Sequence, residues 1–567
     1  MGIYYTCEEN TLILISLLKK YNIKKIIASP GTTNCSFVAS VQNDHFFEVF
    51  SAVDERAASF MACGLAEASS EPVVLTCTGA TASRNYVPGL TEAYYKKLPV
   101  LAVTSTQHLG RVGNYVPQVI DRTKQFADMC KLSLQLSTIF SSEDRENAVT
   151  RVNEVLLELS SKTPGPCHIN LVTNYSNDFS VKVLPEYRKI NRYYLSDELP
   201  IIGDRKVGVY IGSHSDFSDE LKIAIEKFCE VNNAIVLSDH ICNYRGKYKI
   251  HANILNNQNF SYHTKEFDLI IDIGYVSGYL PFYSKEIWRV NEDGKIRNRF
   301  NRITAVFEMS ELDFFNQYNN GQTKNTSLYE KCVIEKKDLD SQIPNLPFSN
   351  LWISQQTSKV LPNDSVIHLA ILNTLRAWGY FEIDDSILAY SNTGGFGIDG
   401  CMSSMIGAAL ASPNKKIYGF IGDLAFFYDQ NSLMNIIPSN LHIMVINNGC
   451  GTEFKNYNHR CSYFGEDAIP FMAAKGHNGF KSKRLVANYS KNLGIDYYSA
   501  SNKDEYFDVI DKWINSEKAC ILEVFTNDYD ESNALKMINS IKSDFKHRVW
   551  AKIRNTKLGG LVKKILR

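Results

Sequence analysis

The chain carries no excess of charge of either sign. Its 567 residues include 61 Lys and Arg and 61 Asp and Glu, so the formal net charge is zero. A protein that binds nucleic acid over much of its surface carries a basic excess. The balance therefore argues against this class, and we expect no nucleic-acid partner.

Paired cysteines and long apolar runs are also lacking. None of the 13 cysteines belongs to a CxxC pair, which argues against a zinc ribbon or a disulfide framework. No apolar run approaches the roughly 20 residues that span a membrane. The first residues show no secretory signal pattern. We therefore expect reduced thiols in a cytoplasmic protein.

A dinucleotide-binding fingerprint is missing as well. Gly212 follows an apolar stretch at residues 206–211, but no further glycines complete a GxGxxG pattern. This argues against a nicotinamide oxidoreductase. Hydrophobic residues make up 44% of the chain and charged residues 22%, which is typical of a well-packed globular protein.

Three stretches of alternating apolar strands and helical patterns are present. Strands of this kind form parallel sheets with both faces covered, so we predict the α/β class with three consecutive α/β domains. We place the domains at residues 1–180, 200–345 and 347–545. The strands expected from apolar runs lie at residues 25–28, 73–77, 100–104 and 168–172, then 206–211, 234–238, 269–273 and 303–307, then 365–368, 386–390, 416–421, 442–446 and 519–524.

The last 22 residues form a basic tail. Residues 546–567 contain eight Lys or Arg and no Asp or Glu, with apolar residues between them. An amphipathic basic segment suits peripheral contact with an anionic membrane surface or an acidic partner. The alternative is a solvated terminal helix.

The segment from Gly422 to Asn448 has the pattern of a metal and diphosphate site. Gly422-Asp423 follows one apolar run, and Asn447-Asn448 follows the next, about 25 residues later. Mg²⁺ prefers oxygen ligands and often combines one or two side chains with phosphate oxygens. Asp423, Asn448 and the backbone C=O of Cys450 offer such oxygens, and we call these three groups the metal site. The alternative is an ordinary strand-helix-strand unit.

A second acidic motif lies in the first domain. Asp54-Glu55-Arg56 opens a helical pattern in AVDERAASFMACGLAEA (52–68). Acidic residues favour helix N-termini because of the helix dipole, which is the plain structural explanation. The alternative is that the carboxylate of Glu55 contacts a cofactor and tunes its reactivity.

Further segments connect the two motifs in a common pattern. In chain order they are SPG (29–31), TCTGATASRNYVPGLTEAYY (76–95), RVGNYVPQVID (111–121), SNTGGFGIDGCMSSMIGAALA (391–411) and GDLAFFYDQNSL (422–433). Together with VDERAASFMACGLAEAS, they resemble thiamine-diphosphate enzymes. The resemblance is to the branch of 2-succinyl-5-enolpyruvyl-6-hydroxy-3-cyclohexene-1-carboxylate synthase, a carboligase of menaquinone synthesis.

The resemblance implies two cofactors, thiamine diphosphate and Mg²⁺, held by the first and third domains. Glu55 would hydrogen-bond the pyrimidine N1′, and Gln118 would face the reacting carbon. The metal site would hold Mg²⁺, and Ile398 would bend the cofactor. The implied cofactor-binding residues are Pro30, Glu55, Asn85, Gly397, Ile398, Asp399, Gly422, Asp423, Leu424, Ala425, Asn448, Cys450, Gly451 and Thr452. The resemblance also implies a homodimer or homotetramer with its active site at the subunit interface.

The chain departs from this family at two substrate arginines. Thr32-Thr33 stands in the first turn, where the family has Ser-Arg, and Thr393 stands where it has a second arginine. Threonine cannot replace the fixed charge and planar fork of arginine. Arg111 and Arg376 remain candidates for binding a substrate anion. We therefore expect a small 2-oxo acid and an acceptor other than the substrates of menaquinone synthesis.

Three activities stay open within this resemblance. The first is decarboxylation of a 2-oxo acid with transfer of the acyl-anion equivalent to an acceptor. The second is simple decarboxylation to an aldehyde, for which Tyr115 or Glu453 would donate the proton, while His108 and His459 lie in loops. The third is a non-catalytic scaffold of the same fold.

Overall fold

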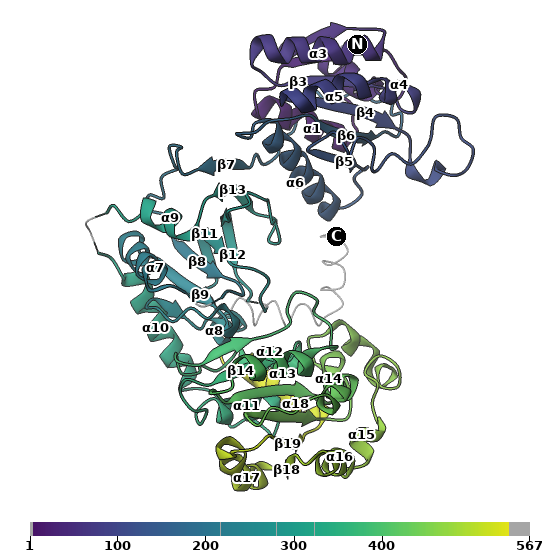
Figure 1. Ribbon diagram of the computed structural model, residues 1–567. Helices are drawn as coiled ribbons and strands as arrows, with labels where there is room; N and C mark the ends of the chain where they lie inside the picture. Colours follow the sequence, from purple (N-terminus) through teal and green to yellow (C-terminus); the bar gives the residue numbers. More distant parts are fainter. Residues whose placement is uncertain (1–3, 216, 279, 322–323, 544–567) are drawn as a thin grey trace. The chain divides into compact units, whose positions relative to one another are not determined.

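The computed structural model describes residues 4–215, 217–278, 280–321 and 324–543. The predicted basic tail at 546–567 lies outside these residues. Within them, no helix is long and apolar enough to cross a membrane. The chain divides into two compact units, which are described separately: an N-terminal unit (Met1–Leu199 and Asn291–Met309) and a C-terminal unit (Pro200–Val290 and Ser310–Arg567). Figure 1 shows both units, with colours that follow the sequence from the N-terminus to the C-terminus.

The N-terminal unit contains a six-stranded parallel sheet in the order β2-β1-β3-β4-β6-β5. Its strands are β1 (Lys25–Ala28), β2 (Glu48–Ser51), β3 (Val73–Cys77), β4 (Val100–Thr106), β5 (Leu132–Leu136) and β6 (Cys167–Val172). Its helices are α1 (Glu9–Lys20), α2 (Cys35–Val41), α3 (Glu55–Ser69), α4 (Thr81–Asn85), α5 (Val87–Lys96) and α6 (Ser142–Leu159). Two further strands of this unit, β7 (Asn191–Tyr194) and β13 (Ile303–Glu308), pair in parallel.

Both faces of this sheet are covered. One apolar core joins α1, α2 and α6 to the sheet, and a second joins α3 and α5 to its other face. All side chains of β3, β4 and β6 are buried, as expected for a parallel sheet between two helical layers.

The C-terminal unit contains the strands of two more sheets. The first group, in the order β10-β9-β8-β11-β12, comprises β8 (Val207–Ile211), β9 (Ile235–Ser238), β10 (Lys249–Ile250), β11 (Glu266–Ile273) and β12 (Tyr283–Val290). The last sheet, in the order β15-β14-β16-β17-β19-β18, comprises β14 (Val366–Leu369), β15 (Leu388–Tyr390), β16 (Ile417–Gly422), β17 (Leu441–Asn447), β18 (Asp496–Ala500) and β19 (Cys520–Phe525).

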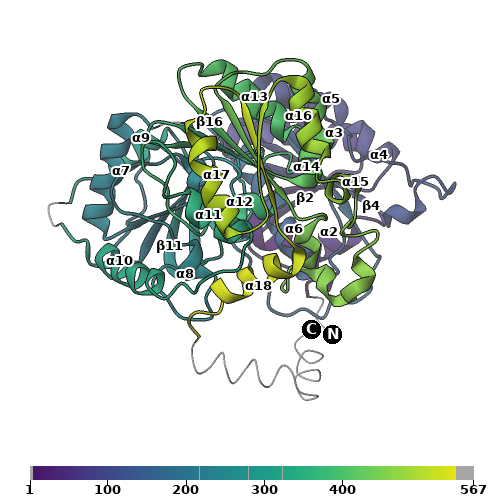
Figure 2. The same cartoon turned by 90° about the horizontal axis from the view of Figure 1, so that it is seen from below.

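Helices cover these strands. They are α7 (Asp219–Asn232), α8 (Asn253–Asn256), α9 (Glu311–Gln317), α10 (Ser327–Asp340), α11 (Asn350–Thr357), α12 (Asn373–Trp378), α13 (Cys401–Ala411), α14 (Asp423–Asp429), α15 (Asn478–Lys481), α16 (Leu485–Leu493), α17 (Lys503–Asn515) and α18 (Asp528–Ile538). Figure 2 shows the last sheet between α13, α14 and α16 on one side and α11, α12 and α17 on the other.

The predicted α/β class is confirmed, because the described residues form three sheets of parallel strands with interleaved helices. The strands expected from apolar runs are present. Six strands were not predicted: the exposed edge strand β2, β7 between the first two predicted domains, and β5, β10, β12 and β18. The domain boundaries at 180, 200 and 345 stay a prediction.

Four histidines are buried inside the two units, and His240 is half-buried. Burial lowers the pKa of His168 to about 3 and that of His240, His368 and His442 to about 4. Burial also lowers the pKa of His251 well below its usual value. The unfolded chain, with histidine pKa values near 6.5, binds protons that the folded chain does not. Stability from these groups is therefore full above pH 6.5 and is lost as the pH falls towards 4.

We expect the free energy of unfolding to fall steeply between pH 6.5 and 5. Each buried histidine contributes up to about 1.4 kcal/mol per pH unit. His442→Asn keeps a donor towards Trp513 O, which lies 2.7 Å from His442 Nδ1. Between pH 6.5 and 5, the free energy of unfolding of this variant should fall by about 2 kcal/mol less than that of the wild type. Denaturant unfolding at both pH values measures this, with the exposed His45→Asn as control. An unchanged pH dependence in His442→Asn would contradict the prediction.

Candidate active site

Two predicted metal ligands follow neighbouring strands of the last sheet. Asp423 comes directly after β16, and Asn448 comes directly after β17. Because these strands are parallel and paired, both side chains lie at the carboxyl edge of the sheet. Only 2% of Asp423 and 7% of Asn448 are exposed. Asp423 Oδ2 accepts a 2.7 Å hydrogen bond from Gly449 N, so the structure brings the two loops together.

The loop after Asn448 has a fixed shape. Gly449 has φ +79°, and a Cβ there would lie 2.6 Å from the ring of Phe480, so only glycine fits without strain. Asn448 Nδ2 donates to Thr452 Oγ1 at 3.3 Å. The C=O of Cys450 accepts a 3.0 Å hydrogen bond from Thr452 N. The two predicted oxygen ligands of this loop therefore lie within one tight turn.

The metal site consists of hard oxygen donors. Mg²⁺ takes such donors and usually completes its shell with phosphate oxygens and water. Across the described ranges, no cluster of three His, Cys, Asp or Glu side chains is placed to hold a metal. A carboxylate, an amide oxygen and a carbonyl thus fit a Mg²⁺ ion that is shared with a diphosphate.

A histidine that the sequence reading missed contacts the metal site. His477 Nε2 lies 2.9 Å from Asp423 Oδ2. His477 Nδ1 accepts a hydrogen bond of 3.2 Å from Phe480 N, so Nε2 carries the proton and donates it to the carboxylate. His477 therefore orients Asp423, as outer-shell partners of metal ligands commonly do.

We expect His477→Ala to raise the Mg²⁺ concentration required for thiamine diphosphate binding by about 10- to 100-fold. Loss of the hydrogen bond leaves the Asp423 carboxylate less well oriented. Calorimetric titration at graded MgCl₂ measures the shift, and the exposed His45→Ala is the control. Partial rescue by His477→Gln is expected, since glutamine restores a donor. An unchanged Mg²⁺ requirement in His477→Ala would refute the positioning role.

Two buried carboxyl groups lie behind the metal site. Glu531 accepts hydrogen bonds from Thr526 Oγ1 (2.7 Å) and Asn350 N (3.1 Å). Burial, with a smaller contribution from the charge of Asp423, raises the pKa of Glu531 to about 7. Burial also raises the pKa of Glu523. Acidic groups gathered in a buried region favour the binding of a cation there.

In the N-terminal unit, Glu55 is the first residue of α3. The side chain of Asp54 caps this helix by accepting from Arg56 N at 2.9 Å and Ala57 N at 3.3 Å. Asn85, at the end of α4, donates to Glu55 Oε2 at 3.3 Å. The structure therefore brings together the two residues that the resemblance placed at the pyrimidine.

Gln118 and Arg111 lie in an exposed segment after β4. Gln118 has φ +66°, a conformation that costs a non-glycine residue free energy and is common at functional sites. Arg111 donates to the side chain of Gln107. Neither Gln118 nor Arg111 contacts Glu55 through a hydrogen bond among the described residues.

The first turn is packed against the sheet. Thr33 is buried and hydrogen-bonded to Thr78, whereas Pro30 and Thr32 are exposed. Nearby, the buried Arg122 donates to Ser105 O at 2.6 Å, and burial lowers the pKa of Arg122 to about 10. The Thr33 hydroxyl therefore already has a hydrogen-bond partner within the N-terminal unit. The sequence reading did not single out Arg122.

The segment before α13 contains two predicted residues that are engaged within the protein, Thr393 and Ile398. Thr393 is buried, and its Oγ1 donates to Val276 O at 2.9 Å. Ile398 packs against the apolar core of the last sheet. The remaining predicted residues of this unit lie in the loop before α13 (Gly397 and Asp399), around the start of α14 (Gly422, Leu424 and Ala425) and in the loop after β17 (Gly451).

Arg376 has an acidic partner. Its Nη1 forms an ion pair with Glu453 Oε2, and His459 Nε2 lies 3.9 Å from Glu453 Oε1. Arg376 is therefore charge-compensated within the protein, which weakens its attraction for a substrate carboxylate.

Comparison with protein families agrees with this arrangement. Residues 11–126 match the thiamine pyrophosphate enzyme N-terminal TPP binding domain, and residues 374–524 match the C-terminal TPP binding domain. The chain therefore matches both binding domains of this enzyme family, one in each unit. The first match contains Glu55, Asn85 and Gln118, and the second contains Asp423 and Asn448.

The chain is also similar to whole proteins over most of its length. A 2-succinyl-5-enolpyruvyl-6-hydroxy-3-cyclohexene-1-carboxylate synthase of Bacteroides thetaiotaomicron is 27% identical over 94% of this chain and 98% of the relative. The enzyme of that name from Flavobacterium psychrophilum is 25% identical over the same shares. The Staphylococcus saprophyticus enzyme is 26% identical over 79% of this chain and 83% of its own. The predicted relationship to this branch is confirmed.

Proposed function

We propose that this chain is a thiamine pyrophosphate- and Mg²⁺-dependent enzyme that decarboxylates a 2-oxo acid and transfers the acyl-anion equivalent to an acceptor. The observation that supports the proposal is that residues predicted for each half of the cofactor site are hydrogen-bonded to one another. Glu55 with Asn85 would form one half-site in the N-terminal unit, and Asp423 with the Asn448 loop would form the other in the C-terminal unit.

Each half-site has a separate task. When bound, thiamine diphosphate would supply the carbon nucleophile and the electron sink for decarboxylation of a 2-oxo acid. Asp423, Asn448 and the C=O of Cys450 would hold Mg²⁺ against the diphosphate. Glu55 would hold a proton at the pyrimidine N1′, and Gln118 would orient the substrate.

We further propose that the substrates differ from those named for the relatives. The two family arginines are replaced by Thr33 and Thr393, and both threonine hydroxyls are engaged within the protein. Arg376 is paired with Glu453. These features support a substrate pair with fewer carboxylates, because fixed guanidinium forks are what bind them tightly.

A panel of 2-oxo acids with thiamine diphosphate and Mg²⁺ tests this proposal. CO₂ release and product mass are recorded with and without candidate acceptors, including 2-oxoglutarate with isochorismate. A ligated product is expected when an acceptor is present. An aldehyde as the sole product would favour simple decarboxylation, for which Glu453 is a candidate proton donor. CO₂ release from none of the acids would favour the scaffold.

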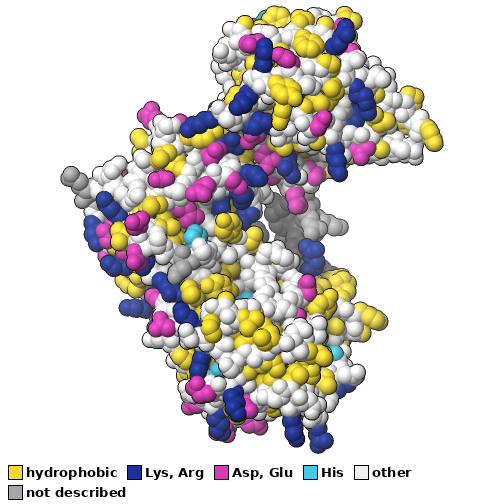
Figure 3. Space-filling model, in the orientation of Figure 1, with side chains coloured by type: hydrophobic (Ala, Val, Ile, Leu, Met, Phe, Trp, Pro, Cys, Tyr) yellow, Lys and Arg dark blue, Asp and Glu magenta, His cyan; other side chains and the backbone are white. Residues whose placement is uncertain are grey.

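Exposed hydrophobic side chains support a homo-oligomer. Phe60 and Met61 on α3 and Tyr94 and Tyr95 on α5 are each at least 47% exposed. Figure 3 shows hydrophobic side chains on the face that carries these helices. Such patches mark interaction surfaces. We expect sedimentation velocity to show a dimer or tetramer, and a monomer at micromolar concentration would contradict the proposal.

A further inference from the structure

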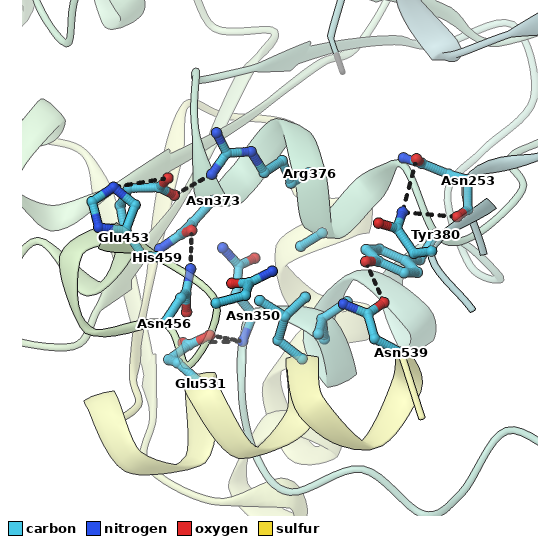
Figure 4. Close-up of a pocket in the computed structure, with 15 residues that line it drawn as sticks. Asn253, Asn350, Asn373, Arg376, Tyr380, Glu453, Asn456, His459, Glu531 and Asn539 are labelled. Atoms are coloured by element: carbon cyan, nitrogen blue, oxygen red, sulfur yellow. Dashed lines mark hydrogen bonds and ion pairs between the residues drawn. The ribbon is translucent and has the colours of Figure 1, made fainter. Parts of the chain in front are cut away.

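Two cavities of the C-terminal unit fall within the range of about 300–1,000 Å³ that is usual for small-molecule sites. The one in Figure 4 is lined by Arg376 and Glu453 beside the loop after the metal site, so it belongs to the proposed active site. The other has a volume of about 620 Å³ and shares no lining residue with the first. We call it the basic cavity, because its lining includes Arg245, Lys247, Lys249, Lys336 and Lys337.

Three segments line the basic cavity: residues 245–251, one face of α10 and residues 382–385 before β15. The lining residues of α10 are spaced as on one helix face, at Tyr329, Val333, Lys336, Lys337 and Asp340. In the first segment, Tyr248 has φ +66°, and a Cβ at Gly246 would clash with the buried ring of Tyr244. This wall of the cavity therefore has a fixed shape.

Three of the four carboxylates in the lining have lysine partners. Lys336 Nζ lies 2.5 Å from Asp340 Oδ2 and 3.7 Å from Glu382 Oε1. Lys249 Nζ lies 2.5 Å from Asp385 Oδ1. These three carboxylates engage only two of the five cations of the basic cavity.

The fourth carboxylate, Asp384, is exposed and is hydrogen-bonded to Ser386. It accepts from Ser386 N at 2.9 Å and from Ser386 Oγ at 2.5 Å. These hydrogen bonds, and to a smaller extent the charge of Arg245, lower the pKa of Asp384. Asp384 therefore senses the charge of Arg245, yet it forms no hydrogen bond with Nε or Nη2 of that guanidinium.

Arg245 lacks a partner. Its side chain is half-buried, and its Nε and Nη2 are shielded from solvent without a hydrogen bond in the part of the chain that the structure describes. Leaving buried donors of a charged group unpaired is costly. Lys247 and Lys337 are exposed, and neither side chain forms an ion pair with a described residue. Three cations of the basic cavity are therefore free to bind an anion.

The chemistry of this lining favours a phosphate ester. A guanidinium presents a planar fork that binds phosphate through two parallel hydrogen bonds. A phosphate monoester carries about 1.5 to 2 negative charges at pH 7, which suits several cations better than a single carboxylate does. The organic part of such an ester would contact the apolar lining, which consists of Ile250, Val333, Ile383 and the rings of Tyr248 and Tyr329.

We propose that the basic cavity binds a phosphate monoester of a small organic molecule, with the phosphate group on Arg245 and near Lys247 and Lys337. The cavity lies within one unit and is separate from the proposed active site. This binding therefore goes beyond the proposed reaction and does not depend on it.

Calorimetric titration of the full chain in EDTA tests this binding, because without Mg²⁺ the metal site has no cation to hold a phosphate group. The probes are glucose 6-phosphate, ribose 5-phosphate and phenyl phosphate, each compared with its unphosphorylated parent, and succinate as a dicarboxylate. We expect at least one ester to bind and its parent not to bind. Arg245→Gln should weaken that binding by about 10- to 100-fold, as for loss of hydrogen bonds to a charged group.

Two further variants make this test specific. Lys337→Gln changes an exposed position of α10 and should weaken ester binding by about two- to fivefold. Lys359→Gln changes an exposed lysine outside the lining and should bind as the wild type does. Because the Arg245 side chain has no partner in the protein, the thermal midpoint of Arg245→Gln should not fall. If that variant does not fold, the double variant Lys247→Gln with Lys337→Gln carries the test, with an expected loss of about tenfold.

Three results would overturn the proposal: no ester binding at millimolar concentration, equal affinity in Arg245→Gln and the wild type, or tighter binding of succinate than of every ester. Thiamine diphosphate titration of the wild type in MgCl₂ is a separate measurement, so this proposal and the catalytic one fail independently.

Discussion

Asp423→Asn is expected to weaken thiamine diphosphate binding in the presence of Mg²⁺ by about 100-fold. Asp423 supplies the only fixed negative charge of the proposed metal site, and the amide cannot replace it. The variant keeps one oxygen, which can still accept from Gly449 N and hold the loop, and it gives up the acceptor of Leu424 N. Calorimetric titration of the cofactor in MgCl₂ measures the change.

A control separates this loss of charge from a loss of fold. Asp511→Asn changes an exposed aspartate on α17 and should leave the titration unchanged. The thermal midpoint of Asp423→Asn should change little, because the loss of one accepted hydrogen bond is offset by the removal of repulsion between Asp423 and the buried carboxyls Glu531 and Glu523. Wild-type affinity in Asp423→Asn would mean that the metal lies elsewhere.

Glu55→Gln is expected to lower cofactor-dependent CO₂ release by about 10²- to 10⁴-fold. The carboxylate would hold a proton at the pyrimidine N1′, and glutamine can hydrogen-bond there but cannot exchange that proton. Diphosphate binding depends on the other half-site, so thiamine diphosphate affinity should change much less than turnover. Single-turnover CO₂ release with an accepted 2-oxo acid gives the comparison.

Glu143→Gln is the matched control for this prediction. Glu143 is an exposed glutamate in the first turn of α6, so it shares the helix-start position of Glu55 but has no proposed role. Equal turnover in Glu55→Gln and the wild type would rule out activation by Glu55.

Much of the fold follows from local sequence. Strands β3, β16 and β17 are near-continuous apolar runs, and such runs indicate buried parallel strands. Strand β2 reads EVFS and is largely exposed, so hydrophobicity alone does not distinguish it from a loop. It is a strand because its backbone pairs with β1, which is a tertiary effect.

For the candidate site, too, local sequence predicts only part of the arrangement. Asp423 and Asn448 were predictable, because each follows an apolar strand and parallel neighbours end at one edge of the sheet. His477 was not, since it is 54 residues from Asp423 in sequence and reaches it only through the packing of α15. The ion pair of Arg376 with Glu453 likewise joins residues that are 77 apart. Local sequence carries no signal for such contacts.

The most direct test of the metal site is calorimetric titration of the full-length wild-type chain with thiamine diphosphate, in MgCl₂ and in EDTA. We predict saturable binding at one site per chain in MgCl₂ and at least a 100-fold loss of affinity in EDTA. Absence of binding in MgCl₂, or the same affinity in both buffers, would contradict a Mg²⁺–diphosphate site at Asp423 and Asn448.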